Sequence, residues 1–281
     1  MSRILEADIV FFFDSMDRTI LLEMLQVRVA DGSLLRLIGK CLHVGVLDGE
    51  EFSEPDRGTT QGSVISPILA NIYLHYVLDL WFDREVKPRL RGKAVLLRYA
   101  DDFVIGFERQ DDAERVMDVL PKRMARHGLA LHPDKTRLLC FRRPPSAQTS
   151  AKGPATFDFL GFTLYWRRTR GGRWVMGCKT RTSRLRRSIQ AVADWRRRHR
   201  HLPVKVQHVA LKRRIDGHVN YFGVNDNARS LLLLIEAAKR SWLKWLRRRS
   251  QRTRLSWERF NALLVRFPFP RARISVQIWG R

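Results

Sequence analysis

Two adjacent aspartates interrupt an otherwise apolar stretch, VLLRYADDFVIGFE, at residues 95–108. The residues on both sides are mostly β-branched, aromatic or leucine, which is the composition of paired, buried strands. The pattern therefore predicts a β-hairpin with Asp101 and Asp102 at its tip. Because neighbouring carboxylates repel, we expect the pair either to be solvated turn residues or to hold a cation. The apolar strands on both sides favour the second alternative.

Charge is distributed very unevenly along the 281 residues. Residues 1–150 carry a net charge of −1, whereas residues 151–281 hold 32 Lys and Arg against six Asp and Glu. Such an excess repels itself unless a polyanion neutralises it, so we expect a nucleic-acid partner, with an anionic membrane surface as the weaker alternative. The chain has no apolar run of membrane-spanning length and no signal peptide, and its three cysteines are widely spaced. We expect a soluble, cytoplasmic protein of a bacterial type that does not bind membranes, with no disulfide scaffold.

The first half of the chain alternates strand and helix patterns. Strands are predicted within 4–14, on both sides of Asp101–Asp102 and at 135–141, and helices after Asp17, from Ser66 to about Glu85 and over 111–128. Ser66 with Pro67 forms a candidate N-terminal cap, and Asp111 with Glu114 resembles a capping box. This order predicts an α+β fold of the split βαβ type, in which helices cover one face of an antiparallel sheet.

A Pro/Ser/Gly/Thr-rich stretch near 142–156 marks a boundary, so two domains are expected at 1–150 and 151–281. The second domain is predicted to begin with a short strand region, FDFLGFTLYW, and a basic hairpin around Gly171–Gly172. Helices with an apolar stripe beside a basic face follow.

Three carboxylates are candidates for one site. Asp8 ends the first predicted strand, and a split βαβ fold places that strand beside the hairpin that carries Asp101 and Asp102. Mg²⁺ would relieve their mutual repulsion, since it prefers oxygen ligands. Two such ions about 4 Å apart are the usual apparatus for in-line phosphoryl transfer. A basic chain with a convergent acidic site suggests an enzyme that acts on nucleic acid.

Five ordered motifs resemble the group II intron reverse transcriptase/maturase family over nearly the whole chain. They are EADIVFFFDSMD, GTTQGSVISPILANIYLHYVLD, YADDFVIGF, GLALHPDKTR and FDFLGF. The basic helices and the segment SWERFNALLVRFPFPRARI resemble the family's thumb and maturase region. The resemblance implies a right-hand polymerase palm with a ferredoxin-like antiparallel sheet at 1–150. A primer-grip region and a mostly helical thumb/maturase domain would follow at 151–281.

The resemblance also implies roles for individual residues. Two Mg²⁺ ions would be bound by Asp8, Asp101 and Asp102, with the backbone carbonyl of Ile9 as a further ligand. Phe13 would lie against the sugar of the incoming nucleotide, although a core position is the alternative for this residue. Gln61 would reach the nucleotide or the template pair, Lys135 would lie near the triphosphate unless it is an ordinary surface lysine, and Leu160–Gly161 would grip the primer end.

The sequence departs from the family pattern in two places. Thr60 stands where the family has proline, which leaves Gln61 in register. Only seven residues precede Asp8, whereas the family has a fingers region there whose basic residues clamp template and nucleotide. We therefore expect an N-terminally truncated chain that binds metal and RNA but polymerises poorly. A Cys/His cluster of the HNH endonuclease type is absent from the sequence.

Arginine and tryptophan alternate in two segments, WRRRHRH from Trp195 and WLKWLRRR from Trp242. We expect the tryptophans to be core residues and the arginines to contact RNA, the alternative being a solvated basic face. The arginines concerned are Arg196, Arg197, Arg198, Arg247, Arg248 and Arg249.

Two compatible functions follow from these features. The first is an RNA-directed DNA polymerase of a mobile intron, which uses deoxynucleotides, an RNA template and a DNA primer. The second is a maturase that binds intron RNA and assists splicing, with polymerase activity lost through truncation. The sequence does not predict an oligomeric state.

Overall fold

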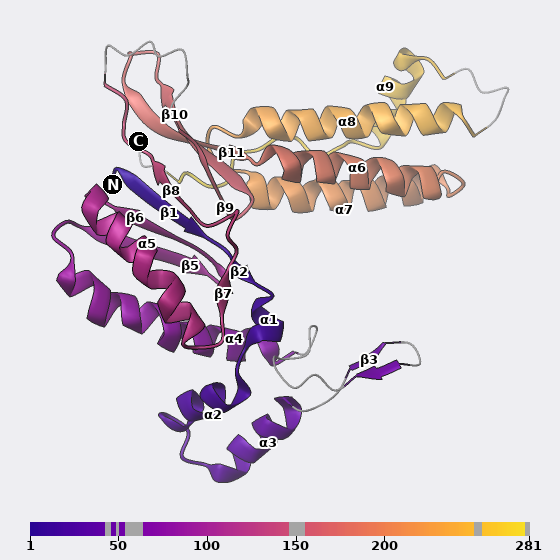
Figure 1. The fold of residues 1–281 in the computed structure, drawn as a ribbon. Coiled ribbons are helices and arrows are strands. Elements are labelled where there is room, and N and C mark those ends of the chain that lie inside the picture. The colour runs from indigo at the N-terminus through magenta and orange to yellow at the C-terminus, as the bar shows by residue number, and fades with distance from the viewer. Residues whose placement is uncertain (43–45, 49–50, 54–63, 146–154, 250–254, 279–281) are drawn as a thin grey trace. The chain divides into compact units, whose positions relative to one another are not determined.

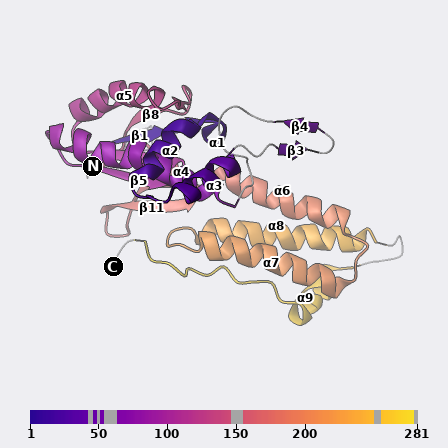
Figure 2. The same ribbon diagram turned by 90° about the horizontal axis from the view of Figure 1, so that it is seen from below.

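The computed structural model describes residues 1–42, 46–48, 51–53, 64–145, 155–249 and 255–278. These residues form two compact units, unit 1 up to Ala155 and unit 2 from Thr156. Figures 1 and 2 show the elements of both units in two views.

Unit 1 contains a four-stranded sheet, several helices and two small strand pairs. Its strands are β1 (Arg3–Ala7), β2 (Ile9–Val10), β3 (Val46–Asp48), β4 (Glu51–Ser53), β5 (Ala94–Tyr99), β6 (Asp102–Phe107), β7 (Ala130–Leu131) and β8 (Arg137–Cys140). Its helices are α1 (Phe12–Ser15), α2 (Arg18–Gln26), α3 (Gly32–Leu42), α4 (Ser66–Leu74), the π-helical η1 (His75–Asp79) and η2 (Phe82–Val86), the 3₁₀-helical η3 (Lys87–Arg89) and α5 (Gln110–Ala125).

The sheet has the order β5-β6-β1-β8, and all of its pairs are antiparallel. Numbered along the chain, the first strand therefore lies beside the third and the fourth, which is the predicted split βαβ arrangement. The register sets Ala7 of β1 opposite Phe103 of β6. The expected ferredoxin-like sheet is confirmed, and its two inner strands lead directly into the predicted carboxylate site.

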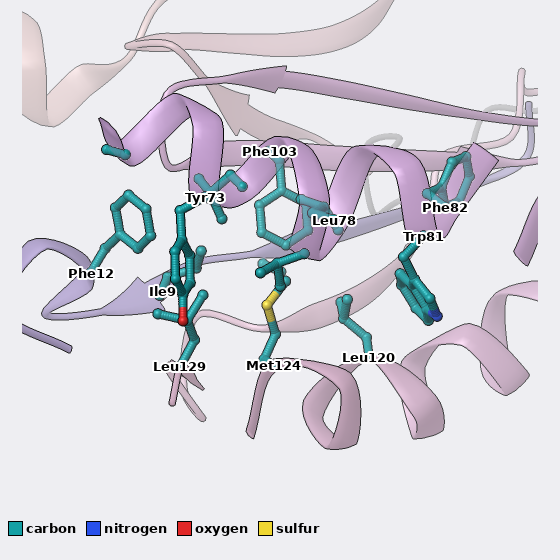
Figure 3. Packing of buried hydrophobic residues seen from close by; sticks show 14 of the residues in the cluster. Ile9, Phe12, Tyr73, Leu78, Trp81, Phe82, Phe103, Leu120, Met124 and Leu129 are labelled. Atoms are coloured by element: carbon teal, nitrogen blue, oxygen red, sulfur yellow. The ribbon is translucent and has the colours of Figure 1, made fainter. Parts of the chain in front are cut away.

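The core of unit 1 lies between one face of this sheet and the helices. Side chains along β1 and β6 point alternately to the two faces of the sheet. The face that contributes to this core includes Leu5, Ala7 and Ile105, all of which are buried. Figure 3 shows the aromatic and aliphatic side chains that fill the space between the sheet and the helices, among them Tyr73, Leu78, Phe103, Leu120 and Met124. Both long helical segments therefore cover the same face.

The helix after Pro67 differs from a regular α-helix. The pattern predicted one helix from Ser66 to about Glu85, and the helical path does extend to Val86, but η1 and η2 are π-helical. The residue preceding this helix, Ile65, is the N-terminal cap, so Ser66 is the first helical residue instead of the predicted cap. Arg123 of α5 donates to the carbonyl oxygens of Tyr76 and Val77 at 3.3 and 3.0 Å. These bonds satisfy carbonyls of a segment whose hydrogen-bond geometry is poorer than that of an α-helix.

Of the two predicted caps at Asp17 and Asp111, the structure confirms the first and not the second. Asp17 accepts hydrogen bonds from the backbone nitrogens of Thr19 and Ile20, as its position before α2 predicted. The predicted capping box at Asp111 was wrong, because α5 begins at Gln110 and its N-cap is Arg109, two residues before Asp111. Asp111 instead forms an ion pair with the guanidinium of Arg109.

Asp112 has a structural role that the sequence pattern did not suggest. Its side chain is buried, and its carboxylate accepts hydrogen bonds from the backbone nitrogens of Arg91 and Gly92, at 3.1 and 2.8 Å, and from Arg115. Burial acts to raise the pKa of Asp112, but the hydrogen bonds from Gly92, Arg91 and Arg115 outweigh it and hold the pKa below its usual value. The carboxylate thus fixes the loop that enters β5.

We expect Asp112→Asn to lower the free energy of unfolding by about 1–3 kcal/mol at pH 7, because buried N–H groups lose an ionised acceptor. The native pKa lies below the unfolded value of about 3.9, so this stabilisation is complete above that value and is lost as the pH falls through the native pKa. Urea unfolding followed by circular dichroism should show a gap between wild type and variant that narrows below about pH 4. Asp111→Asn, at an exposed ion pair, is the control and should have a small effect. Equal effects of the two substitutions would contradict this role.

Unit 2 combines a three-stranded sheet with a bundle of helices. Its elements are β9 (Phe157–Phe159), β10 (Phe162–Arg168), β11 (Trp174–Thr180), α6 (Thr182–Arg198), α7 (Val204–Phe222), α8 (Ala228–Arg247) and α9 (Trp257–Arg266). The sheet order is β11-β10-β9, and β10 and β11 form the hairpin predicted around Gly171–Gly172. Helices α6, α7 and α8 bury an aliphatic and aromatic core that includes Leu211, Ile235 and Trp242. No helix within the described part of the chain is long and apolar enough to cross a membrane.

The turn between α7 and α8 ties the bundle to the sheet. Asn227 is fully buried, and its amide accepts from the backbone nitrogen of Thr180 and donates to the Thr180 hydroxyl and to the carbonyl of Phe222. The carbonyl oxygen of Gly223 accepts bonds from the backbone nitrogens of Ser275 and Val276. The end of α7, the end of β11 and the C-terminal segment therefore meet at one point of unit 2.

Candidate active site

The strand register brings two of the three predicted carboxylates to the same end of the sheet. Asp8 follows Ala7, and Asp102 precedes Phe103, the residue opposite Ala7. Side chains alternate along a strand, and Ala7, Ile9 and Phe103 belong to the core, so Asp8 and Asp102 lie on the face away from it. Neither carboxylate is buried, and the site is therefore accessible from the open face of the sheet.

Asp101 lies in the turn that joins β5 to β6. The preceding residue, Ala100, has a φ of 54°, a left-handed conformation that is uncommon for residues other than glycine. Arg98 donates a hydrogen bond to the carbonyl oxygen of Ala100 at 2.9 Å. The hairpin tip is thus a strained turn held in part by Arg98, a residue that is not among the predicted site residues.

Lys135 lies directly beside Asp8. Its ammonium group is 2.5 Å from Oδ2 of Asp8, and the backbone nitrogen of His132 donates to the Asp8 carbonyl oxygen at 2.8 Å. The segment after β7 therefore contacts the first carboxylate through both backbone and side chain. Within the described residues, no three side chains of His, Cys, Asp and Glu lie close enough together to form a ready-made metal site. In this structure, a lysine neutralises Asp8.

Ile9 and three phenylalanines lie in the segment after Asp8. Ile9, the predicted carbonyl ligand, is buried in β2 opposite Leu131 of β7. Phe13 belongs to α1, is half-buried, and packs against the core with its ring centroid 5.4 Å from that of Phe12. This position is compatible with both alternatives for Phe13, a core residue or a contact with the sugar of the incoming nucleotide. Phe11 was not predicted to matter, but it is 74% exposed and has a left-handed φ of 43°.

The remaining nucleotide-binding and primer-grip predictions fall in different parts of the chain. Gln61 lies outside the described residues. Leu160 and Gly161 form the turn between β9 and β10 in unit 2, with φ angles of 50° and 77°. The Tyr221 hydroxyl donates to the Leu160 carbonyl at 3.1 Å, and the Tyr221 ring stacks on Phe162. The predicted primer-grip turn is therefore anchored on the end of α7.

Five of the six predicted RNA-binding arginines are exposed on unit 2, namely Arg197, Arg198, Arg247, Arg248 and Arg249. Arg196 requires a correction, because it is fully buried. Its guanidinium donates to Gln207 Oε1 and lies about 6 Å from the ring centres of Trp195 and Trp242, and burial lowers its pKa to about 10. Helical spacing explains the error, since one residue in a run of three consecutive arginines turns toward the core.

Tryptophan positions agree with the expected core role. Trp242 is fully buried and donates from Nε1 to Gln207, while Trp195 and Trp245 are half-buried. Basic side chains lie over the half-buried rings, with Arg214 4.6 Å from the centre of Trp195 and Arg248 5.5 Å from that of Trp245. The rings therefore support cationic side chains at the surface of the bundle.

A comparison with known families shows the family to which the chain belongs. Residues 2–164, more than half of the chain, match the family model described as reverse transcriptase (RNA-dependent DNA polymerase). The chain belongs to the reverse transcriptase family. The matched range begins before Asp8, includes Asp101, Asp102 and Lys135, and ends beyond the Leu160–Gly161 turn.

Proteins with similar sequences include intron-encoded proteins. The chain is 38% identical over 91 residues to the group II intron-encoded protein LtrA of Lactococcus lactis subsp. cremoris, a match that covers 30% of this reverse transcriptase and 15% of LtrA. It is 30% identical over 199 residues to protein YkfC of Escherichia coli K12, which covers 60% of this chain and 48% of YkfC. A 91 kDa protein in the cob intron of Schizosaccharomyces pombe is 42% identical over 71 residues, 25% of this chain and 9% of that protein. The predicted resemblance to the group II intron family is confirmed, and the chain spans less than half the length of each of these relatives.

Solved structures show the same fold at low sequence identity. The telomerase of Candida tropicalis without bound ligand matches with a TM-score of 0.51 at 13% identity, over 93% of this reverse transcriptase and 44% of the telomerase. The telomerase of Candida albicans, solved with a fragment of telomeric RNA, matches with a TM-score of 0.50 at 14% identity, over 94% and 42% of the two chains. The expected palm and thumb fold is thus confirmed.

Proposed function

We propose that this reverse transcriptase is the RNA-directed DNA polymerase of a group II intron, and that it extends a DNA primer on an RNA template with deoxynucleotides. One observation carries the proposal: the β1–β6 register sets Asp8 beside Asp102, next to the turn that holds Asp101. Antiparallel pairing thereby joins two motifs more than 90 residues apart in the sequence. Membership of the reverse transcriptase family supports the reaction class.

The donor set suits divalent metal. Asp8, Asp101 and Asp102 offer carboxylate oxygens, which hard cations such as Mg²⁺ prefer, and the attraction of Asp8 for a cation is already visible in its pairing with Lys135. We assign these three residues, with the carbonyl of Ile9, as the holders of two Mg²⁺ ions. When bound, such ions activate the attacking oxygen and stabilise the leaving group in phosphoryl transfer.

Lys135 has a second role in this proposal. Its exposed side chain pairs with Asp8 in this structure, and with a metal ion held at Asp8 the ammonium would be free to reach the triphosphate of the nucleotide. There it stabilises the negative charge of the departing pyrophosphate. Phe13 and Gln61 contact the incoming nucleotide, and the Leu160–Gly161 turn holds the primer end.

Extension of a labelled DNA primer on an RNA template by the purified chain tests the proposal. Addition of deoxynucleotides should depend on Mg²⁺ and on the RNA template, and should stop when EDTA removes the metal. In a second preparation the N-terminal fingers region of a relative precedes Met1, which tests whether its basic residues strengthen extension. Absence of extension in both preparations, with the fold intact, would contradict the polymerase proposal.

A maturase role is favoured by unit 2. The excess of 26 positive charges in residues 151–281, and the five exposed arginines at the ends of α6 and α8, favour binding to intron RNA that assists splicing. Arginine can pair with phosphates and stack on bases, which suits folded RNA. This role requires no polymerase activity and is compatible with it.

We expect RNA binding to weaken steeply with salt, with a log–log slope of about −3 to −5 if five arginines each contact a phosphate. Arg197→Gln with Arg198→Gln should reduce that slope by roughly 1–2 in filter-binding measurements. Arg84→Gln with Arg89→Gln, which removes the same charge from exposed positions of unit 1, is the matched control. Equal slopes for the two double variants, or binding that does not respond to salt, would contradict RNA binding by this surface.

A further inference from the structure

Arg98 makes an unusual number of contacts for a residue at the end of a β-strand. Its Nε and Nη2 donate to the two carboxylate oxygens of Asp79 at 2.8 and 2.6 Å, in a bidentate pair. Its Nη1 donates to Oδ1 of Asn71 and to the carbonyl oxygen of Ala100, both at 2.9 Å. The side chain is 13% exposed, so these bonds are shielded from competing water. One guanidinium thus joins α4, η1 and the hairpin tip.

The helical side of this contact depends on the π-helix. Asn71 belongs to α4 and Asp79 ends η1, eight residues later. In a regular α-helix, eight residues advance about 80° beyond two full turns, so the two side chains would point in different directions. A π-helical turn contains an extra residue and reduces that offset. The π-segment therefore allows both side chains to face the same guanidinium, and π-turns are frequent at functional sites.

The hairpin side of the contact holds a strained turn. Ala100 has a left-handed φ of 54°, which a residue with a Cβ adopts only when its surroundings over-determine it. Its carbonyl is held by Arg98, and the next two residues are Asp101 and Asp102. A change at Arg98 therefore acts directly on the conformation that orients the two aspartates.

We propose that Arg98 is a positioning residue of the polymerase site: it locks the Ala100 turn onto α4 and η1 so that Asp101 and Asp102 bind metal. The inference rests on the proposed polymerase function. The hydrogen bonds of Arg98 go to Asp79, Asn71 and Ala100, so it acts on the two aspartates through the turn that precedes them. Lysine cannot replace it, since a single ammonium does not reproduce the planar fork that reaches three partners at once.

The test compares Arg98→Lys with Arg109→Lys in the full chain. Arg109 lies just after β6, the second strand of the same hairpin, and also forms a bidentate pair, with Asp111. Arg109→Lys therefore controls for the general effect of replacing a paired guanidinium by an ammonium. The readouts are the Kd for Mn²⁺ from electron paramagnetic resonance, kcat and KM for primer extension, and the midpoint of urea unfolding. Asp8→Asn defines the Mn²⁺ signal that belongs to the site.

For Arg98→Lys we expect Mn²⁺ binding roughly 10-fold to 100-fold weaker, as for other groups that orient metal ligands. We expect kcat to fall by a similar factor while KM for the primer-template stays within about twofold, because Arg98 does not contact the nucleic acid. Arg109→Lys should match wild type in both. If Arg98→Lys also lowers the midpoint of urea unfolding, a second variant separates stability from positioning. Asp79→Asn retains the bond from Arg98 to Ala100, so its affinity for Mn²⁺ is expected to be closer to that of wild type than the affinity of Arg98→Lys.

Two results would overturn the inference, and they are distinguishable. If wild type binds Mn²⁺ through Asp8 and extends primers, and Arg98→Lys does both equally well, Arg98 has no positioning role and the polymerase proposal stands. If wild type neither binds Mn²⁺ through Asp8 nor extends primers, the polymerase proposal fails and the inference fails with it.

Discussion

Asp8→Asn is expected to reduce the rate of primer extension by on the order of a thousandfold or more, while leaving the fold intact. Loss of a metal ligand removes several kcal/mol of transition-state stabilisation, and each 1.4 kcal/mol corresponds to a factor of ten. The ion pair that the substitution also breaks, between Asp8 and Lys135, is largely exposed, and pairs of this kind contribute at most about 1 kcal/mol to stability. The expected loss of extension rate therefore comes from the chemical step and not from unfolding. Single-turnover extension rates and circular dichroism measure the two effects separately.

Asp83→Asn is the matched control for this substitution. Asp83 also pairs with an exposed lysine, Lys87, at 3.0 Å, but it belongs to η2 and is not among the metal ligands proposed here. Asp83→Asn should therefore keep the wild-type extension rate. An Asp8→Asn variant that extends primers as fast as Asp83→Asn would remove Asp8 from the site.

Gly223→Ala should destabilise unit 2 by about 1–3 kcal/mol or more, as overpacking in a rigid place does. A Cβ at this position would lie 2.5 Å from the carbonyl oxygen of Val219 and 2.8 Å from that of Arg273, and backbone atoms cannot move aside as a flexible side chain would. The same residue accepts bonds from Ser275 and Val276, so a shift would also disturb the C-terminal segment. Urea unfolding followed by tryptophan fluorescence is a suitable measurement, because seven of the eight tryptophans belong to residues 151–281.

Gly217→Ala provides the control within the same helix. Nothing lies within 4 Å of a Cβ at Gly217, which is an interior position of α7. Alanine is favoured over glycine there by about 1 kcal/mol, so this variant should be more stable than wild type. If both variants shifted the unfolding midpoint in the same direction, the proposed steric cause at Gly223 would be wrong.

Local patterns predicted much of the palm. The apolar runs on both sides of Asp101 and Asp102 predicted the hairpin, and the order of strands and helices predicted the sheet order, because few arrangements satisfy short connections and one covered face. Asp17 predicted the start of α2 through its capping chemistry. The π-helical segments were not predictable in this way, since they depend on partners such as Arg123 from a distant helix.

The candidate site was predicted less completely than the fold. Motif order identified Asp8, Asp101, Asp102 and Lys135, but it did not show that Lys135 pairs with Asp8, which depends on the path of the segment after β7. Arg98 could have been found from its position, because it shares the strand parity of Ala94 and Leu96, whose side chains face the core. A charged residue on a buried face requires a partner. Arg196 was misplaced for the opposite reason, since a run of arginines conceals which of them faces inward.

The sheet order has a consequence for how the site responds to partial unfolding. Asp8 directly follows β1 and Asp102 begins β6; each of these strands has a strand on both sides, whereas β5 and β8 form the edges. Sheets open from their edges, and local opening there costs less free energy than opening of the centre. The edge strands β8 and β5 can therefore fray while β1 and β6 stay paired. The two carboxylates proposed as metal ligands therefore lie next to the central strand pair, which we expect to open after the edges of the sheet.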